Sequence, residues 1–167
     1  FDLLESFDGK LTVAVTAAWV ERSGRLTPYP ERFPDAAAAL RLGVQQGLVE
    51  IANHGLAHCV VKDRAFRPRL MEGNRRFHRE LVDWIPAESH GQHLTRAQAI
   101  LSEYFQVAVQ TLVPPGNQFT ADTLRYAAKL GLKYVSCNAP AGEQEVIQVL
   151  GNQNTLAFHD RDIVLQG

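Results

Sequence analysis

The chain has 167 residues, of which 46% are hydrophobic and 21% are charged, and its formal net charge is −1. This length and composition predict one soluble globular domain with a substantial core. The mixed, nearly balanced charge argues against a nucleic-acid-binding surface, and no apolar run is long enough to span a bilayer. We therefore predict no nucleic-acid partner and no membrane span.

The two cysteines, Cys59 and Cys137, are too few for a disulfide framework. No signal peptide is visible, which favours a cytoplasmic location without fixing it, because both ends look cut from a longer chain. The oligomeric state is left open by the sequence.

The first half of the chain is predicted to alternate strands with helices. Residues 11–16 and 48–52 are short apolar runs rich in β-branched side chains, as expected of buried strands. Between them we expect a loop at residues 24–34, which contain three prolines, and a helix at residues 36–46 that Asp35 caps.

The second half begins with an excursion at about residues 62–93, which has no clear period and is expected to include some helix at 74–83. Helices are then predicted at residues 96–105 and 121–130, the second one capped by Thr120. The expected strands are residues 107–113, 133–136, 146–149 and 155–158. This alternation predicts parallel βα units, in which ligands bind at the carboxyl ends of the strands.

His54 and His58 directly follow a predicted strand, in Glu50-Ile-Ala-Asn-His54-Gly-Leu-Ala-His58. A spacing of four brings two side chains to one face of a helical turn, where two imidazoles can bind a divalent metal. The pair alone is a weak motif, and two unrelated loop histidines are the alternative. Cys59 is a candidate third ligand, with small buried packing as its alternative role.

Two more polar segments follow predicted strands. Pro114-Pro115-Gly116-Asn117 comes after the strand at 107–113, and His159-Asp160 comes after the strand at 155–158. The carboxyl ends of parallel strands meet at one edge of a sheet, so these segments are expected near the histidine pair. That agreement strengthens the prediction of a metal site.

With these segments in this order, the chain resembles the polysaccharide deacetylase family, the family-four carbohydrate esterases with a chitooligosaccharide-deacetylase-like domain. Residues 50–58 match the family's metal motif, His-Ser/Thr-x-x-His after Glu-Ile-x-Asn, except at Gly55. The double proline matches the family's Arg-Pro-Pro-Tyr-Gly segment, with Val113 in place of the arginine, and residues 155–159 fit its late Leu-x-His motif. The resemblance covers about residues 11–166.

This resemblance implies a distorted or incomplete (β/α) barrel of mostly parallel strands, formed by residues 1–167 as a single domain. The family's Thr-Phe-Asp-Asp motif, which provides a base and the third metal ligand, is not found. Ser6-Phe7-Asp8-Gly9 looks similar, but only Lys10 separates it from the next strand, so Asp8 is predicted to be a turn residue. The first strand and the last helix of the fold are therefore expected outside this chain.

The resemblance further implies a metal-dependent hydrolase that removes an acetyl group from an N- or O-acetylated carbohydrate, with zinc as the preferred divalent metal. It implies that His54 and His58 bind the metal and that His159 is the general acid for the leaving group. The second ring nitrogen of each ligand needs an acceptor, for which Asn53 or a backbone carbonyl is suitable.

Two alternatives remain. Val113 and the missing aspartates favour a catalytically inactive carbohydrate-binding or scaffold domain of the same fold. The long excursion favours a hydrolase of small-molecule C–N amide bonds, because it would exclude a polymer from the pocket.

Weaker signals mark five further positions as predicted substrate contacts: Pro115, Asn117, Trp19, Arg79 and Asp160. For Trp19 the alternative is ordinary packing, and for Asp160 it is a solvated turn. Residues 77–80 are otherwise expected on an exposed, charged helix face. His90 and His93 are predicted to lie in a solvated loop.

Overall fold

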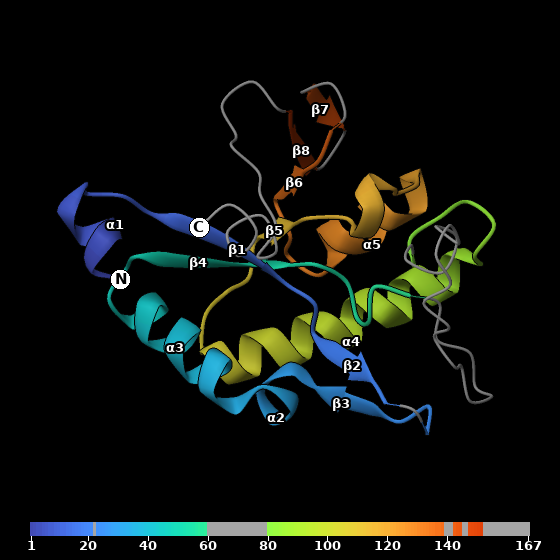
Figure 1. The fold of residues 1–167 in the computed structure, drawn as a ribbon. Coiled ribbons are helices and arrows are strands. Elements are labelled where there is room, and N and C mark those ends of the chain that lie inside the picture. The colour runs from blue at the N-terminus through green and yellow to red at the C-terminus, as the bar shows by residue number, and fades with distance from the viewer. Residues whose placement is uncertain (22, 60–79, 139–141, 145–146, 152–167) are drawn as a thin grey trace.

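The centre of the molecule is a six-stranded sheet, seen in a computed structural model that describes residues 1–21, 23–59, 80–138, 142–144 and 147–151 (Figure 1). The strand order is β1-β4-β5-β6-β8-β7. Its strands are β1 (Leu11–Val15), β4 (Val49–Asn53), β5 (Thr111–Leu112), β6 (Tyr134–Ser136), β7 (Gly142–Gln144) and β8 (Ile147–Leu150). The first five strands in this order run parallel, and β7 pairs antiparallel with β8.

Helices follow β4 and β5 and also lie between β1 and β4 along the chain. The helices are α1 (Asp2–Ser6), α2 (Tyr29–Arg32), α3 (Pro34–Gln45), α4 (Ala87–Phe105), α5 (Ala121–Lys129) and the 3-10 turn η2 (Pro115–Asn117). Helices α3 and α4 lie on the same side of the sheet in Figure 1, and the Arg41 guanidinium lies 5.5 Å from the centre of the Tyr104 ring. Helix α5 begins at a reciprocal cap between Thr120 and Thr123, as its sequence predicts.

A separate two-stranded hairpin follows β1. It pairs β2 (Ala18–Val20) with β3 (Leu26–Pro28) in antiparallel register. Two backbone hydrogen bonds join it to the segment after β4: the Ala17 N–H donates to the Gly55 carbonyl, and the Ala18 N–H donates to the Leu56 carbonyl. The hairpin is therefore tied to the loop that follows β4.

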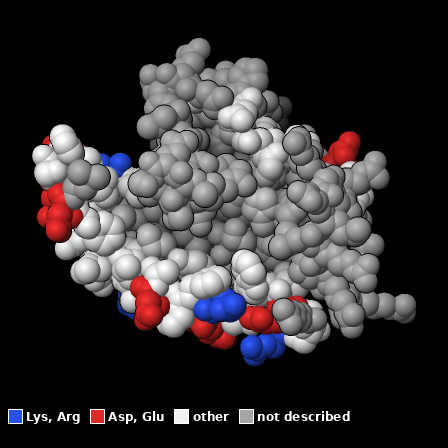
Figure 2. Space-filling model, viewed as in Figure 1, with Lys and Arg blue, Asp and Glu red and all other residues white. Residues whose placement is uncertain are grey.

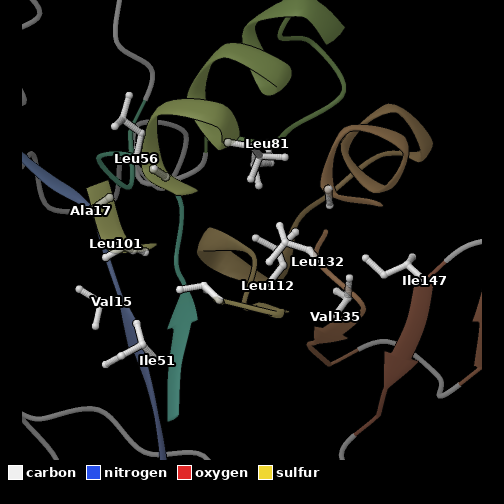
Figure 3. Close-up of a cluster of buried hydrophobic side chains, with 14 of the residues drawn as sticks. Val15, Ala17, Ile51, Leu56, Leu81, Leu101, Leu112, Leu132, Val135 and Ile147 are labelled. Atoms are coloured by element: carbon white, nitrogen blue, oxygen red, sulfur yellow. The ribbon is translucent and has the colours of Figure 1, made fainter. Parts of the chain in front are cut away.

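The core lies between the sheet and its helices, and Figure 3 shows the side chains that form it. Strand residues such as Ile51, Leu112 and Val135 contribute branched apolar groups, and Leu101 of α4 packs against them. Full burial of one such side chain stabilises the fold by about 1.5–3 kcal/mol relative to exposure. This packing fixes the position of β4, whose carboxyl end leads into the histidine pair.

The fold class is the one predicted, a mostly parallel α/β sheet with helices. Within the described residues the strands form an open sheet, as in an incomplete (β/α) barrel. No helix in the described part of the chain is long and apolar enough to cross a membrane.

The largest error in the predicted elements concerns α4. The helix was expected from residue 96, but it begins at Ala87, after Pro86. His90 and His93, which were predicted in a solvated loop, are 1% and 8% exposed on its inner face. The apolar period was lost because these two buried histidines count as polar in a hydropathy pattern, although His90 lies four residues before Leu94 and His93 four residues before Ala97, on the same buried face.

Three other predictions were wrong in part. The loop expected at 24–34 contains β3 and α2, because proline is compatible with the first turn of a helix. Only Thr111–Leu112 of the strand expected at 107–113 pair in the sheet, and the Val109 carbonyl instead accepts a hydrogen bond from the Gln98 side chain. Helix α3 starts at Pro34 after Phe33, and Asp35 makes no side-chain cap.

The excursion also differs from its prediction where it is described. Residues 80–83 are not helical, and Glu80, expected on an exposed helix face, is fully buried. Its neighbours 77–79, the rest of the helix expected at 74–83 and the strand expected at 155–158 lie outside the described residues.

Candidate functional site

The two histidines of the motif lie together at the carboxyl end of β4. The centroids of the His54 and His58 rings are 4.8 Å apart, with the ring planes at 65°. Both side chains are partly exposed, while Ile51, Ala52 and Asn53 directly before them are buried. The spacing in sequence thus corresponds to two neighbouring imidazoles at the edge of the sheet.

The ring of His54 is oriented by the neighbouring strand end. Its Nδ1 lies 2.6 Å from the Val113 carbonyl oxygen, and a neutral imidazole donates its proton in such a contact. The lone pair is then on Nε2, which is the arrangement found in histidines that bind metals. Of the two acceptors that the sequence suggested, the backbone carbonyl is the one used.

Asn53 stabilises the turn that follows β4. It is fully buried, its Oδ1 accepts the Gly55 N–H at 2.9 Å, and its Nδ2 donates to Gln98. Gly55 has a φ of +77°, which favours glycine, so the asparagine side chain closes the tight turn that follows the strand. The turn sends the chain from His54 back toward His58.

Two of the predicted substrate contacts lie at η2. Pro115 is buried and packs on the histidine loop, since its Cγ is 2.8 Å from the place a Cβ on Gly55 would take. Asn117 is exposed, and its Oδ1 accepts the Asn138 N–H. The structure therefore brings Pro115 to the histidine loop and leaves Asn117 on the surface at the same turn.

Trp19 is on β2 of the hairpin and is 49% exposed. It meets Phe33 edge to face at a centroid distance of 5.7 Å, with the Arg32 guanidinium 5.9 Å from its ring. The Ala18 N–H, one residue before, binds the Leu56 carbonyl of the histidine loop. The remaining predicted site residues, Arg79, His159 and Asp160, lie outside the described residues.

Cys59 was a candidate third ligand, with small buried packing as its alternative role. The thiol is buried, as that alternative expects. Burial, and to a smaller degree the Glu80 carboxylate, raise its pKa to about 12. Among the described residues no three His, Cys, Asp or Glu side chains converge on one point, so they offer two imidazoles that fit a metal and no complete set of ligands.

Asp8 agrees with its prediction as a turn residue. It follows α1 with a φ of +49° and is exposed. It precedes β1, whereas the histidines follow the parallel strand β4. The two therefore lie at opposite edges of the sheet, and Asp8 is not part of the site.

A buried polar cluster beneath the loop was missed by the sequence analysis. Glu80 accepts a hydrogen bond from His93 Nδ1 at 2.9 Å, and His90 lies beside it on α4, 2.9 Å from the Thr123 hydroxyl. Burial lowers the pKa of His90, although the Val82 carbonyl at its Nε2 acts in the opposite direction. The signal that was available is the continuation of the α4 apolar period through residues 90 and 93.

These features define the class of protein: an α/β fold whose candidate ligand site is at the carboxyl edge of a parallel sheet. The family profile described as polysaccharide deacetylase matches residues 1–135. The chain belongs to the polysaccharide deacetylase family. Among curated protein sequences none matches the chain.

Solved structures agree with this fold. The deacetylase domain of BpsB from Bordetella bronchiseptica has a TM-score of 0.54 at 21% identity, covering 81% of this chain and 56% of that one. IcaB from Ammonifex degensii has a TM-score of 0.54 at 14% identity, covering 90% and 58%. BA3943 of Bacillus anthracis, a family-four pseudoenzyme, has a TM-score of 0.50 at 12% identity, covering 80% and 35%. The chain thus spans 35–58% of the length of these three structures.

Charge is mixed on the described part of the face shown in Figure 2. In Figure 2 acidic and basic side chains alternate along the lower edge of the face shown. This edge has no patch of a single sign, which agrees with the nearly neutral composition.

Proposed function

We propose that this chain is the hydrolase domain of a deacetylase that removes an acetyl group from an N- or O-acetylated carbohydrate with the help of a divalent metal, zinc for preference. The observation that supports it most is the pair of imidazoles at the carboxyl end of β4, 4.8 Å apart. Membership of the polysaccharide deacetylase family supports the reaction class.

In this proposal His54 and His58 hold the metal. A bound divalent metal supplies Lewis acidity, which polarises a carbonyl and lowers the pKa of water. The Val113 carbonyl keeps the proton of neutral His54 on Nδ1, so that Nε2, which carries the lone pair, would be the ligand atom. A carboxylate from outside the described residues completes the protein ligands.

The remaining steps are assigned to residues by the family resemblance. Hydrolysis of an N-acetyl group breaks the carbonyl C–N bond, and the departing nitrogen takes up a proton. His159 would provide that proton, since an imidazole titrates near neutral pH. Pro115, Asn117, Trp19, Arg79 and Asp160 would contact the sugar, with Trp19 the best placed of the described ones to stack because it is half exposed.

The test is the zinc content of the purified protein together with acetate release from chitooligosaccharides and from small N-acetyl amides. His54→Ala and His58→Ala are expected to lose zinc and activity, while His90→Gln, a change at a buried histidine away from the pair, keeps the zinc. Equal zinc content in wild type and His54→Ala would reject the proposal. Turnover of small amides alone would replace the carbohydrate with a small C–N substrate.

One observation favours a second candidate, a carbohydrate-binding or scaffold domain without activity. The family motif has arginine where this chain has Val113, and the solved neighbours include a pseudoenzyme. Saccharide binding without acetate release, measured on zinc-loaded protein, would support this candidate over the first.

A further inference from the structure

The loop from Asn53 to His58 is fixed by hydrogen bonds to several parts of the molecule. The His54 N–H donates to the Val15 carbonyl, and the carbonyls of Gly55 and Leu56 accept from residues 17 and 18. These bonds secure the first half of the loop to the segment after β1. The second half, at Ala57 and His58, does not share them.

Glu80 is the partner of that second half. The Ala57 N–H donates to Glu80 Oε2 at 3.3 Å, and His93 Nδ1 lies 2.9 Å from the same oxygen. Glu80 is fully buried, and among the described residues its Oε1 has no hydrogen-bond partner. Burying a carboxylate with one oxygen unpaired costs free energy of desolvation, so the position of Glu80 requires a physical explanation.

The position of Oε1 shows how closely the carboxylate fits the loop. A Cβ built on Gly55 would lie 1.7 Å from Oε1 and 2.8 Å from the carboxyl carbon of Glu80. The Glu80 side chain thus occupies the space that any side chain at residue 55 would need. The loop conformation and the glutamate are mutually dependent.

The end of the loop that Glu80 holds is also its strained part. His58 has a φ of +54°, a left-handed conformation that costs about 1–2 kcal/mol for a residue with a Cβ. Such a conformation persists only where neighbouring contacts enforce it. The Ala57 N–H, one residue before His58, provides one such contact through Glu80.

We propose that Glu80 and His93 are positioning residues that hold the loop after β4 in the conformation that places His58 beside His54. Helix α4 supplies His93, and His93 orients the carboxylate that binds the loop. The consequence for metal affinity rests on the proposed function, whereas the consequence for loop order does not. Glu80 is not itself assigned as a ligand, because it forms no three-residue metal group with the two histidines.

The experiment compares four variants of the full chain. Glu80→Ala removes the acceptor, Glu80→Gln keeps an oxygen acceptor at similar volume, and His93→Ala removes the group that orients it. Thr123→Val is the matched control, because it breaks a buried hydrogen bond to α4 at His90, together with the Thr123 half of the α5 cap, without touching the loop. The readouts are zinc affinity, by competition with a chromophoric chelator, and hydrogen exchange of the amides from residue 54 to residue 58.

Glu80→Ala is expected to weaken zinc binding about 10- to 100-fold, the usual effect of removing a residue that supports the ligands of a metal site, and to speed exchange at Ala57 about tenfold or more. His93→Ala is expected to show the same changes to a smaller extent, and Glu80→Gln and Thr123→Val to remain within about threefold of wild type. If Glu80→Ala does not fold, the comparison of His93→Ala with Thr123→Val decides the question.

The outcomes separate the two proposals. If wild type binds no zinc, the proposed function fails, and the exchange rates alone judge the positioning role. If wild type binds zinc and neither Glu80→Ala nor His93→Ala differs from Thr123→Val in affinity or in exchange at Ala57, the positioning role is overturned and the proposed function is unaffected.

Discussion

Two glutamates near the ends of β4 show how differently one residue type is used within one sheet. Glu50 is exposed at the start of the strand, and both of its oxygens accept hydroxyl hydrogen bonds, at 2.8 Å from Thr12 and 2.7 Å from Thr111. Glu80, beneath the loop after the strand, is fully buried and binds the loop through one oxygen. The exposed, fully paired acid joins three strands, whereas the buried, half-paired one binds the turn that carries the two histidines.

This difference shows that the number of hydrogen bonds a carboxylate accepts does not indicate how much its removal will cost. An exposed carboxylate can exchange its hydroxyl partners for water at little cost. A buried one leaves its donors without a partner when it is removed, and here one donor, the Ala57 N–H, belongs to the loop that holds the histidines, while the other, His93 Nδ1, belongs to α4.

The largest expected effect is at Gly55. Gly55→Ala combines left-handed strain with a Cβ 1.7 Å from the Glu80 carboxylate, so we expect a loss of about 3–5 kcal/mol in the free energy of unfolding. Gly47→Ala is the control, with a φ of +72° and no atom within 4 Å of the added carbon, and should lose only about 1–2 kcal/mol. Urea unfolding measures both, and equal losses would show that the glutamate leaves room for a side chain.

The next effect compares the two glutamates directly. Glu80→Ala leaves the part-buried Ala57 N–H and the buried His93 Nδ1 without their acceptor, and we expect about 2–3 kcal/mol of destabilisation in urea unfolding. Glu50→Ala at the exposed position should cost about 1 kcal/mol or less. A larger loss at Glu50 would contradict the contrast between the two regions.

A smaller effect extends the comparison to pH. Because burial lowers the pKa of His90 in the folded state, the unfolded chain takes up a proton there that the folded chain does not. The contribution of neutral His90 to the free energy of unfolding is then fully present above the unfolded pKa of about 6.5. It falls as the pH drops below that value, by at most about 1.4 kcal/mol per pH unit. The difference in stability between wild type and His90→Gln should therefore shrink from pH 7.5 to pH 5, and a constant difference would contradict the assignment.

The smallest effect is expected at the hydroxyl partners of Glu50. Thr111→Val keeps the β-branched shape that favours a strand and removes one hydrogen bond to an exposed carboxylate, so stability should change by about 1 kcal/mol or less. This change in stability is measured by thermal unfolding of Thr111→Val, in comparison with Thr123→Val. A cost at Thr111 equal to that at the fully buried Thr123 would show that Glu50 is more than a surface link.

Much of the fold is encoded locally and was predictable. The β-branched runs before Thr16 and Asn53 form β1 and β4, and the Thr120 cap starts α5 as expected. The family resemblance is confirmed by the profile match, and the histidine pair occupies the strand end at which its motif placed it.

The rest depends on contacts that no local pattern records. Glu80 was expected on an exposed face because its sequence neighbours are charged, yet its partners Ala57 and His93 are 23 and 13 residues away. The predicted start of helix α4 was too late because a buried, fully hydrogen-bonded histidine behaves as a core residue. A hydropathy pattern cannot distinguish such a histidine from a solvated one.

The contact between His54 and the Val113 carbonyl has a consequence for mutational scanning. The atom that orients the imidazole belongs to the main chain, so exchanging the Val113 side chain for alanine leaves that oxygen in place. Its direction is set instead by the next residue, since Pro114 restricts the backbone of the residue before it to an extended form. An alanine scan would therefore record residue 113 as dispensable and attribute its contribution to the proline.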